Sequence, residues 1–430
     1  MVKFVKYSLW FFLFLLAACS ATRKSNTPRN LRMIYHPGTL SLNPEAKVYN
    51  TSDTSSLLLV KIAARELLFN LANVDRELLA NVEVYYSLYD LNGEKEKELV
   101  DSATTTFRFK KDPKIEYHRL KIDLATQPGK EYLLEVRITD QNRDHQQYAF
   151  LKIDRKQNYA LQDFIVQQKM ENEWLVHPWI TGDVFFKIAH YKDSLDSLKV
   201  FYFPLTDKIP VSPDQNDSVP EVYSQPDTSW MCYPDSLDYD NFSGKGMYYF
   251  SVHDKPEDGL ALFNFGKYFP EIRTPDELFN PLAYLQEIDT MFVGDTTGKY
   301  KKLYVDHFWL QRAKNMERSR ELIKLFYNRV YYANLYFTSH VEGWRTDRGM
   351  IYIVYGLPDY VHKSGGEERW IYHHDAMGPG IIFYFYNQQN PYSLNHFVLD
   401  REKIKSTEWD AFLELWNSGE IIYTSPEGYR

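Results

Sequence analysis

The sequence predicts a mainly β protein with a C-terminal α+β domain, and three features of its 430 residues carry this prediction. Short runs in which apolar and polar residues alternate, separated by turn residues, fill roughly the first two thirds of the chain. Aromatic residues, which favour strands, make up 16% of it. A helical spacing of apolar residues begins only after about residue 274. We therefore expect two β-sandwiches, followed by a domain that combines a helix with an antiparallel β-meander.

Residues 1–18 have the features of a bacterial lipoprotein signal peptide. Two lysines precede the almost wholly apolar run Tyr7–Ala18, which is shorter than the ~20 residues that span a bilayer. The run ends in Leu16-Ala17-Ala18-Cys19, which resembles the lipobox that precedes an acylated cysteine. An ordinary secretory signal or a transmembrane anchor is the alternative. We predict that Cys19 is lipidated and that the membrane is a partner of the chain.

Residues 19–30 form a short polar tether in this interpretation. No aspartate follows Cys19, and no acidic cluster comes after it, so the tether does not resemble signals for inner-membrane retention or surface export. We expect an outer-membrane protein that faces the periplasm, with surface display as the alternative. The lipid would hold the chain at the membrane, at ~0.8 kcal/mol per buried methylene.

The cysteine count argues against an intramolecular disulfide, and the net charge argues against a nucleic-acid partner. With Cys19 lipidated, Cys232 is the one remaining cysteine, so an intramolecular disulfide is ruled out and packed cores must supply the stability. The net charge is −8, with acids and bases well mixed, which gives no electrostatic case for a nucleic-acid partner. The 34 tyrosines suit β-sheets, and a surface that stacks on sugars is the alternative use.

Residues 31–155 are predicted to form the first sandwich, of immunoglobulin-like type. The run Val82–Leu88 alternates with the period of a half-buried strand, and Gln127-Pro128-Gly129-Lys130 is a turn. We also assign Leu57–Phe69 to strands, although a helix would accept its Ala63-Ala64-Arg65-Glu66. The other expected strands are Thr104–Phe109, His118–Leu124, Tyr132–Thr139 and Tyr148–Ile153.

Residues 156–273 are predicted to form a second β-rich domain. Its best strands are Asp183–Ala189, Leu198–Phe203 and Met247–Val252. Between them, Asp207 to Asp240 is dense in Pro, Asp and Ser, which predicts a long surface excursion. Two such domains in series would act as a spacer between the lipid and the last domain.

Residues 274–430 are predicted to form the α+β domain. Thr274 can cap a helix that continues with Pro275 and Glu277, and Asp306 to Phe337 carries apolar residues on one helical face. Four strands and a final helix should follow, at Met350–Tyr355, Glu368–His373, Ile381–Tyr386, Asn395–Leu399 and Ser406–Trp416.

Between the helix and the first of these strands lies Gly343-Trp344-Arg345-Thr346-Asp347-Arg348-Gly349. This run, with the Met350–Tyr355 and Gly356-Leu357-Pro358 that follow it, closely resembles the signature of the GWxTD domain family of bacterial envelope proteins. The resemblance extends over about 120 residues, from Asp306 to Trp416. It implies an envelope context. No activity is established for the family, so the resemblance supplies no catalytic residues.

The residue types of the motif predict a connector that reverses the chain. Gly343 and Gly349 could each take a positive φ, and Thr346 and Asp347 could bond nearby backbone N–H groups. Trp344 would bury its ring.

The charged members of the motif leave two interpretations open. Arg348 could pair with Asp347 or Glu342 inside a folding signature. In the alternative, Trp344 and Arg345 are exposed and bind a partner protein, because Trp and Arg dominate interfaces.

Enzymatic interpretations have weak support. His373-His374-Asp375, with His340 or His362, could hold a metal, but adjacent strand residues point to opposite faces. We predict no metal and no cofactor, since phosphate-binding loops and a nucleophile elbow are also missing from the sequence. Paired carboxylates for glycoside hydrolysis stay open.

The expected function is therefore that of a non-catalytic scaffold or accessory subunit in an envelope assembly for secretion or outer-membrane biogenesis, with an envelope protein as partner. A glycan-binding or glycan-processing lipoprotein is the alternative, and coplanar exposed aromatic rings on a sandwich face would favour it.

Overall fold

A computed structural model describes the chain from residue 30 to residue 420, with gaps. The described ranges are 30–36, 42–71, 77–92, 97–157, 159–168, 173–181, 185–205, 208–215, 225–235, 237, 239–253, 258–286, 298–364, 366–372, 380–404 and 407–420. The predicted signal peptide, Cys19, most of the tether and His373-His374-Asp375 lie outside them. No helix within these ranges is long and apolar enough to cross a membrane.

The first β-domain has two antiparallel sheets whose apolar faces enclose one core, as predicted. Val82 and Val84 point into this core and alternate with the more exposed Asn81 and Glu83. One sheet has the order β1-β2-β6, and in the other β5 and β7 flank β4, with β8 beyond β7. The strands are β1 (Glu45–Ser52), β2 (Ser55–Ala63), β3 (Asn70–Leu71), β4 (Leu78–Asp90), β5 (Glu98–Lys110), β6 (Tyr117–Ala125), β7 (Glu131–Asp140) and β8 (His145–Asp154).

The second β-rich region contains two smaller sheets. One has the order β10-β9-β11 and the other β13-β12-β14-β15. The predicted excursion from Asp207 to Asp240 is wrong in part, because β13 lies within it and pairs with β12. The strands are β9 (Phe164–Gln168), β10 (Glu173–Trp174), β11 (Phe186–His190), β12 (Leu198–Pro204), β13 (Thr228–Cys232), β14 (Gly246–Ser251) and β15 (Gly259–Asn264).

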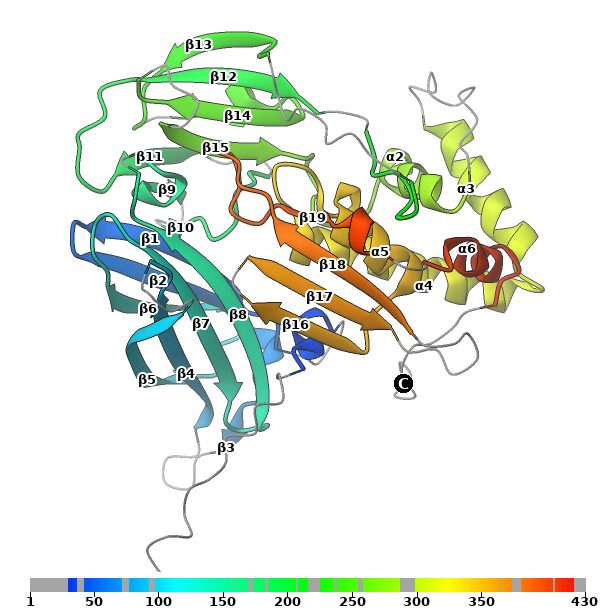
Figure 1. The fold of residues 1–430 in the computed structure, drawn as a ribbon, viewed down its shortest axis with the longest axis horizontal. Helices are drawn as coiled ribbons and strands as arrows, with labels where there is room; N and C mark the ends of the chain where they lie inside the picture. The colour runs from blue at the N-terminus through cyan, green and yellow to red at the C-terminus, as the bar shows by residue number, and fades with distance from the viewer. Residues whose placement is uncertain are drawn as a thin grey trace, which may run out of the picture. The chain divides into compact units, whose positions relative to one another are not determined.

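The C-terminal region combines helices with the four-stranded antiparallel sheet β16-β17-β18-β19 (Figure 1). The predicted capping box is present, with the Thr274 hydroxyl accepting a hydrogen bond from the Glu277 backbone N–H. The elements are α2 (Pro275–Phe279), α3 (Lys299–Arg312), α4 (Met316–Phe337), α5 (Asp347–Tyr355), β16 (Tyr360–Ser364), β17 (Glu367–Tyr372), β18 (Ile381–Asn387), β19 (Phe397–Leu399) and α6 (Trp409–Asn417).

Two predicted elements of this region were wrong. The helix expected from Asp306 to Phe337 is two helices, because the Asn315 side chain accepts a hydrogen bond from the Arg318 N–H and starts α4 anew. The strand expected at Met350–Tyr355 is part of helix α5. Every residue from Arg348 to Tyr355 is buried, so this helix has no polar face and its sequence shows no helical period.

The residues that directly follow the tether pack into the C-terminal region. Leu31, Ile34 and Tyr35 share a core with Phe337, Trp370 and other residues of α4, α5 and the β16–β19 sheet. Residues 31–430 form a single compact unit. The chain therefore does not extend as a row of spacer domains.

Candidate functional site

The motif Gly343–Gly349 connects α4 to α5 through a single 3₁₀ turn, Gly343–Arg345. A Cβ atom on Gly343 would lie 2.0 Å from the Ala333 carbonyl oxygen, and one on Gly349 would lie 1.9 Å from that of Gly343. Both glycines are therefore required by close approach of backbone to backbone. The predicted positive φ is wrong, since neither glycine is among the described residues with that conformation.

Trp344 is a buried anchor, with 6% of its surface exposed. Its ring packs edge-on against Tyr284, whose hydroxyl donates a 2.8 Å hydrogen bond to the Trp344 carbonyl. The Trp344 N–H donates to the side-chain oxygen of Asn334 on α4. The motif backbone is thus tied to two neighbouring segments.

Arg345 is also buried, so the interpretation that exposes it together with Trp344 is wrong. Its guanidinium lies over the Trp344 ring, and its Nε lies 2.7 Å from a carboxylate oxygen of Glu342. Burial raises the pKa of Glu342, although Arg345 opposes that rise. The Arg345 Nη1 also donates to the backbone carbonyl of Lys208, which belongs to the second β-rich region.

Thr346 and Asp347 both accept hydrogen bonds from backbone N–H groups, as predicted, but Thr346 bonds a near neighbour and Asp347 a residue far along the chain. The Thr346 hydroxyl caps α5 by accepting from the Gly349 N–H, and it donates to the Gly343 carbonyl. Asp347 accepts from the N–H of Leu399, far along the chain, and pairs with Arg401 at 2.9 Å. Arg401 in turn donates to the carbonyl of Val211. The predicted Arg348–Asp347 pair does not form.

Arg348 pairs instead with Glu368 of β17, at 3.1 Å, and both side chains are buried. The other oxygen of Glu368 accepts hydrogen bonds from the Tyr35 hydroxyl and the Trp370 indole N–H. Arg348 also donates to the side chain of Asn395. Through Glu368 and Asn395, Arg348 thus connects the N-terminal segment, the sheet and the loop before β19.

Lys363 is the second cation of this cluster, 3.4 Å from Glu368. Burial alone would raise the pKa of Glu368, but Lys363 and Arg348 outweigh it and hold that pKa below its ordinary value. Burial lowers the pKa of Lys363, and it raises that of Tyr35 well above its usual range. The cluster thus places one buried carboxylate between two cations, of which Arg348 is sealed from solvent and Lys363 is partly exposed.

Sequence reasoning missed the partners Glu368, Arg401 and Tyr35. They lie 20 to more than 300 residues from the motif, so spacing along the chain gives no clue to them. One signal was available for Glu368. It shares the inward phase of β17 with Trp370 and Tyr372, and a charged residue at a buried phase requires a partner.

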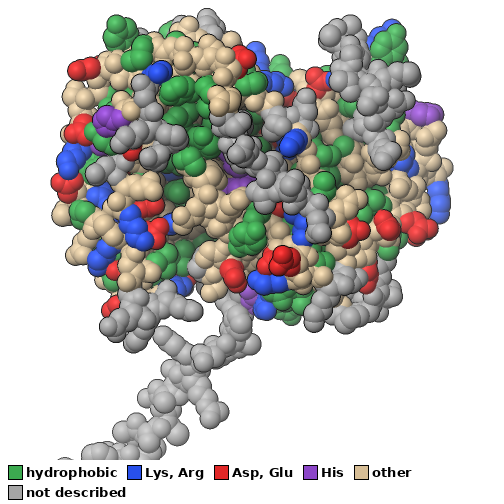
Figure 2. All heavy atoms as spheres, turned by 45° about the horizontal axis from the view of Figure 1, so that its top comes forward, with side chains coloured by type: hydrophobic (Ala, Val, Ile, Leu, Met, Phe, Trp, Pro, Cys, Tyr) green, Lys and Arg blue, Asp and Glu red, His purple; other side chains and the backbone are tan. Residues whose placement is uncertain are grey.

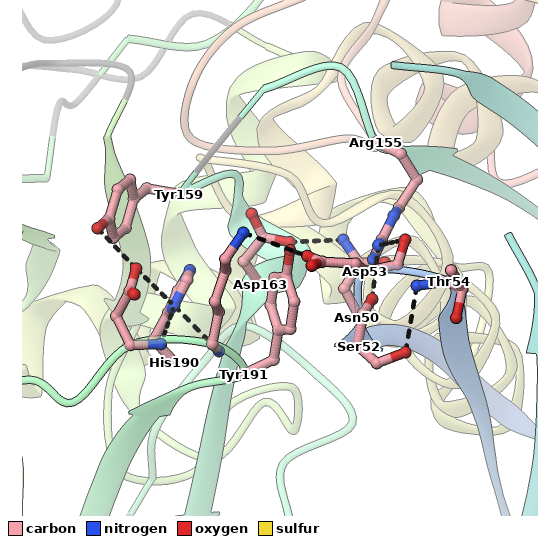
Figure 3. A network of polar contacts seen from close by, with 11 residues as sticks. Asn50, Ser52, Asp53, Thr54, Arg155, Tyr159, Asp163, His190 and Tyr191 are labelled. Atoms are coloured by element: carbon pink, nitrogen blue, oxygen red, sulfur yellow. Dashed lines mark hydrogen bonds and ion pairs between the residues drawn. The ribbon is translucent and has the colours of Figure 1, made fainter. Parts of the chain in front are cut away.

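A second polar network joins the first β-domain to the region that follows it (Figure 3). The buried Asp163 accepts a 2.6 Å hydrogen bond from the side chain of Asn50 on β1. Arg155 donates to the backbone carbonyls of Ser52 and Asp53. Burial raises the pKa of Asp163. These contacts join segments more than 100 residues apart.

The described part of the chain offers little for metal or nucleophile chemistry. It contains no group of three His, Cys, Asp or Glu side chains arranged to hold an ion. His340 lies against His396 rather than beside the predicted His362. Burial raises the pKa of the Cys232 thiol to about 11, which disfavours the reactive thiolate.

The aromatic residues are largely structural. None of the tryptophans within the described ranges is exposed. A groove of about 520 Å³ between β6 and β10 includes Tyr117 and Trp174 in its lining. Its Arg119 is already paired with Glu173. On the face that Figure 2 shows, acidic and basic side chains are interspersed.

Comparison with known proteins identifies the region around the motif. Residues 246–418 match the model of the GWxTD domain. No functionally curated protein matches the sequence. One matching solved structure is a Bacteroides uniformis β-glucuronidase, with 10% sequence identity and a TM-score of 0.18 over 29% of this chain and 13% of that chain. Another is the calcium-binding mutant of Bacteroides uniformis β-glucuronidase 2, with 12% sequence identity and a TM-score of 0.17 over 27% of this chain and 14% of that chain. This chain thus spans about one seventh of those proteins, and likenesses of this size carry no functional information.

Proposed function

Because residues 246–418 form a GWxTD domain, we propose that this chain is a non-catalytic, lipid-anchored envelope protein that acts as a scaffold or accessory subunit. Its assembly would lie at the periplasmic side of the outer membrane and serve secretion or outer-membrane biogenesis. Cys19 would carry the lipid.

The observation that supports this proposal most is the use of the charged motif residues. Arg345 is paired with Glu342, Asp347 with Arg401 and Arg348 with Glu368, and all of these side chains are largely or fully buried. Catalytic groups need access to a substrate. These pairs instead hold together the segments of one body, which is what a scaffold requires.

The glycan-binding alternative has less support from the aromatic side chains. Trp309, Trp344, Trp370, Trp409 and Trp416 are all buried in the C-terminal core, where they cannot stack on a sugar. Among the described residues, the groove that contains Trp174 is one candidate for a glycan site. Loss of polysaccharide binding in Trp174→Ala, without loss of stability, would favour the alternative.

Lipidation is tested by metabolic labelling with a clickable fatty acid. Wild type should take up the label, and Cys19→Ser should not, because lipoprotein processing requires the acylated cysteine. Equal labelling of the two proteins would contradict the lipid anchor.

The scaffold role is tested by purifying the tagged chain from crosslinked membranes. We expect the same envelope proteins to be recovered in repeated preparations, and an untagged strain serves as the background. Recovery of glycan but no protein above that background would contradict the scaffold and support the alternative.

A further inference from the structure

The route of the chain after the tether constrains which part of the protein faces the lipid. The Leu31 N–H donates a 2.9 Å hydrogen bond to the carbonyl of Val361, on the edge strand β16. Four residues later, the Tyr35 hydroxyl bonds Glu368 of β17, and the Tyr35 carbonyl accepts from the Tyr352 hydroxyl of α5. The chain is therefore held at one edge of the β16–β19 sheet from residue 31 to residue 35.

The distance between that edge and the lipid is limited by chain length. Twelve residues along the chain separate Cys19 from Leu31, and a fully extended chain of that length spans about 40 Å. A random coil of this many residues averages about 20 Å between its ends. The edge of the β16–β19 sheet is thus the part of the folded unit that the lipid holds closest.

The two faces of this sheet differ in chemistry. Trp370, Phe383 and Phe385 point inward and are buried in the core that includes residues of helices α4 and α5. The alternate positions point outward. They include Ile371, which pairs with Tyr360 on one side and with Ile382 on the other, and Tyr384 and Tyr386.

This outward face combines apolar and interfacial side chains. Tyr360 is 44% exposed and shares a cross-strand row with Ile371 and Ile382. Tyr386 is 41% exposed and pairs with Glu367 at the other end of these strands. Arg369 pairs with Tyr384 across the strands, and Lys403 lies over the Tyr384 ring. Glu367 is the acidic residue of β17 on this face. Tyrosine rings with cations beside them suit the headgroup region of a bilayer.

We propose that the open face of the β16–β19 sheet docks on the phospholipid surface to which the chain is tethered. The inference rests on the proposed lipidation of Cys19 and adds the orientation of the protein. The GWxTD domain then lies against the membrane. The two β-rich regions are free to meet other envelope proteins.

The test uses the acylated chain in vesicles of phosphatidylethanolamine and phosphatidylglycerol, in a Cys232→Ser background. An environment-sensitive dye is placed at Tyr386→Cys, on the open face, or at Tyr233→Cys, which is 75% exposed just after β13. We expect brominated lipids to quench the dye at 386 several-fold more than at 233. Aqueous iodide should quench it several-fold less. Equal quenching at both positions would overturn the proposal.

Two further measurements separate the alternative outcomes. Intact mass shows whether Cys19 is acylated, so an acylated protein with an unprotected 386 dye refutes the docking alone, whereas an unacylated protein refutes the lipid anchor and the docking together. Ten Gly/Ser residues inserted after Asn26 lengthen the tether, and protection should persist. Loss of protection on lengthening, or protection only in native membranes that contain other proteins, would overturn docking on lipid.

Discussion

Arg348 and Glu368 lie 3.1 Å apart with both side chains shut off from solvent, although twenty residues separate them. Removing one member of a buried ion pair leaves the other charge without compensation, which costs far more than losing an exposed pair. Arg348, the last charged residue of the run Gly343–Gly349, is therefore part of the folded core.

The first prediction concerns this pair. Glu368→Gln should lower the free energy of unfolding by about 3–5 kcal/mol, because Arg348 and Lys363 lose their shared carboxylate. Urea denaturation followed by tryptophan fluorescence measures it. Lys302→Ala, which breaks the exposed pair with Asp306, is the matched control and should cost less than about 1 kcal/mol. Equal effects of the two substitutions would show that the buried network contributes little.

The second prediction concerns the two glycines of the motif. Gly343→Ala and Gly349→Ala each place a Cβ within about 2 Å of a carbonyl oxygen, so the backbone must move. We expect both variants to lose cooperative unfolding or to melt far below wild type. Gly366→Ala is the control, because its Cβ would meet nothing closer than Cβ of Asn387 at 3.8 Å. A Gly343→Ala protein that melts like wild type would contradict the close approach of Gly343 to the Ala333 carbonyl.

The third prediction distinguishes a folding motif from a binding motif. Trp344→Ala should destabilise by about 3–5 kcal/mol, the usual cost of deleting a large buried aromatic side chain. Arg345→Ala should lower the free energy of unfolding by about 1–3 kcal/mol, because it removes the ion pair with the buried Glu342 and the hydrogen bond to the Lys208 carbonyl. Arg320→Ala, on the exposed side of α4, should stay within about 0.5 kcal/mol of wild type. A Trp344→Ala protein that melts normally but no longer recovers its crosslinked partners would make the motif a binding site.

The success of sequence reasoning followed the periodicity of each segment. Strand β4 was predictable because one of its faces is buried and the other is more exposed. Apolar and polar residues therefore alternate along Val82–Leu88. Helix α5 was not, because burial on all sides removes the pattern that separates a helix from a strand. Burial of the whole segment thus hid both the helix and the core role of Arg348.

The residue types of the motif identify it in the sequence, but its long-range contacts could not be predicted from the sequence. Thr346 caps the next helix, a local interaction that a sequence can encode within four residues. Asp347 and Arg348 find their partners in Arg401 and Glu368, which only the folded sheet brings near. The N-terminal Tyr35 joins the same cluster from the far end of the chain. Pairings of this kind depend on the topology of the fold, which cannot be read from a single sequence.

The last prediction is a pH dependence that arises in the same domain. The rings of His340 and His396 lie 4.3 Å apart, and burial lowers the pKa of His340 to about 3 and that of His396 to about 4. In the unfolded chain both pKa values return to about 6.5. Between pH 6.5 and pH 4 the unfolded state therefore binds more protons than the folded state. The contribution of the two neutral histidines to the free energy of unfolding is fully present above pH 6.5. It falls as the solution is acidified, by about 1.4 kcal/mol per pH unit for each histidine.

Urea denaturation at several pH values between 4 and 7 measures this slope. The variant His340→Gln/His396→Gln should have a shallower slope than wild type, because neither glutamine titrates. His307→Gln, at an exposed position of α3, is the control and should keep the wild-type slope. Comparing slopes between variants cancels the opposite contribution of Glu342, whose raised pKa stabilises the folded state on acidification. Parallel slopes for wild type and the double variant would show that the two histidines are not buried as neutral rings.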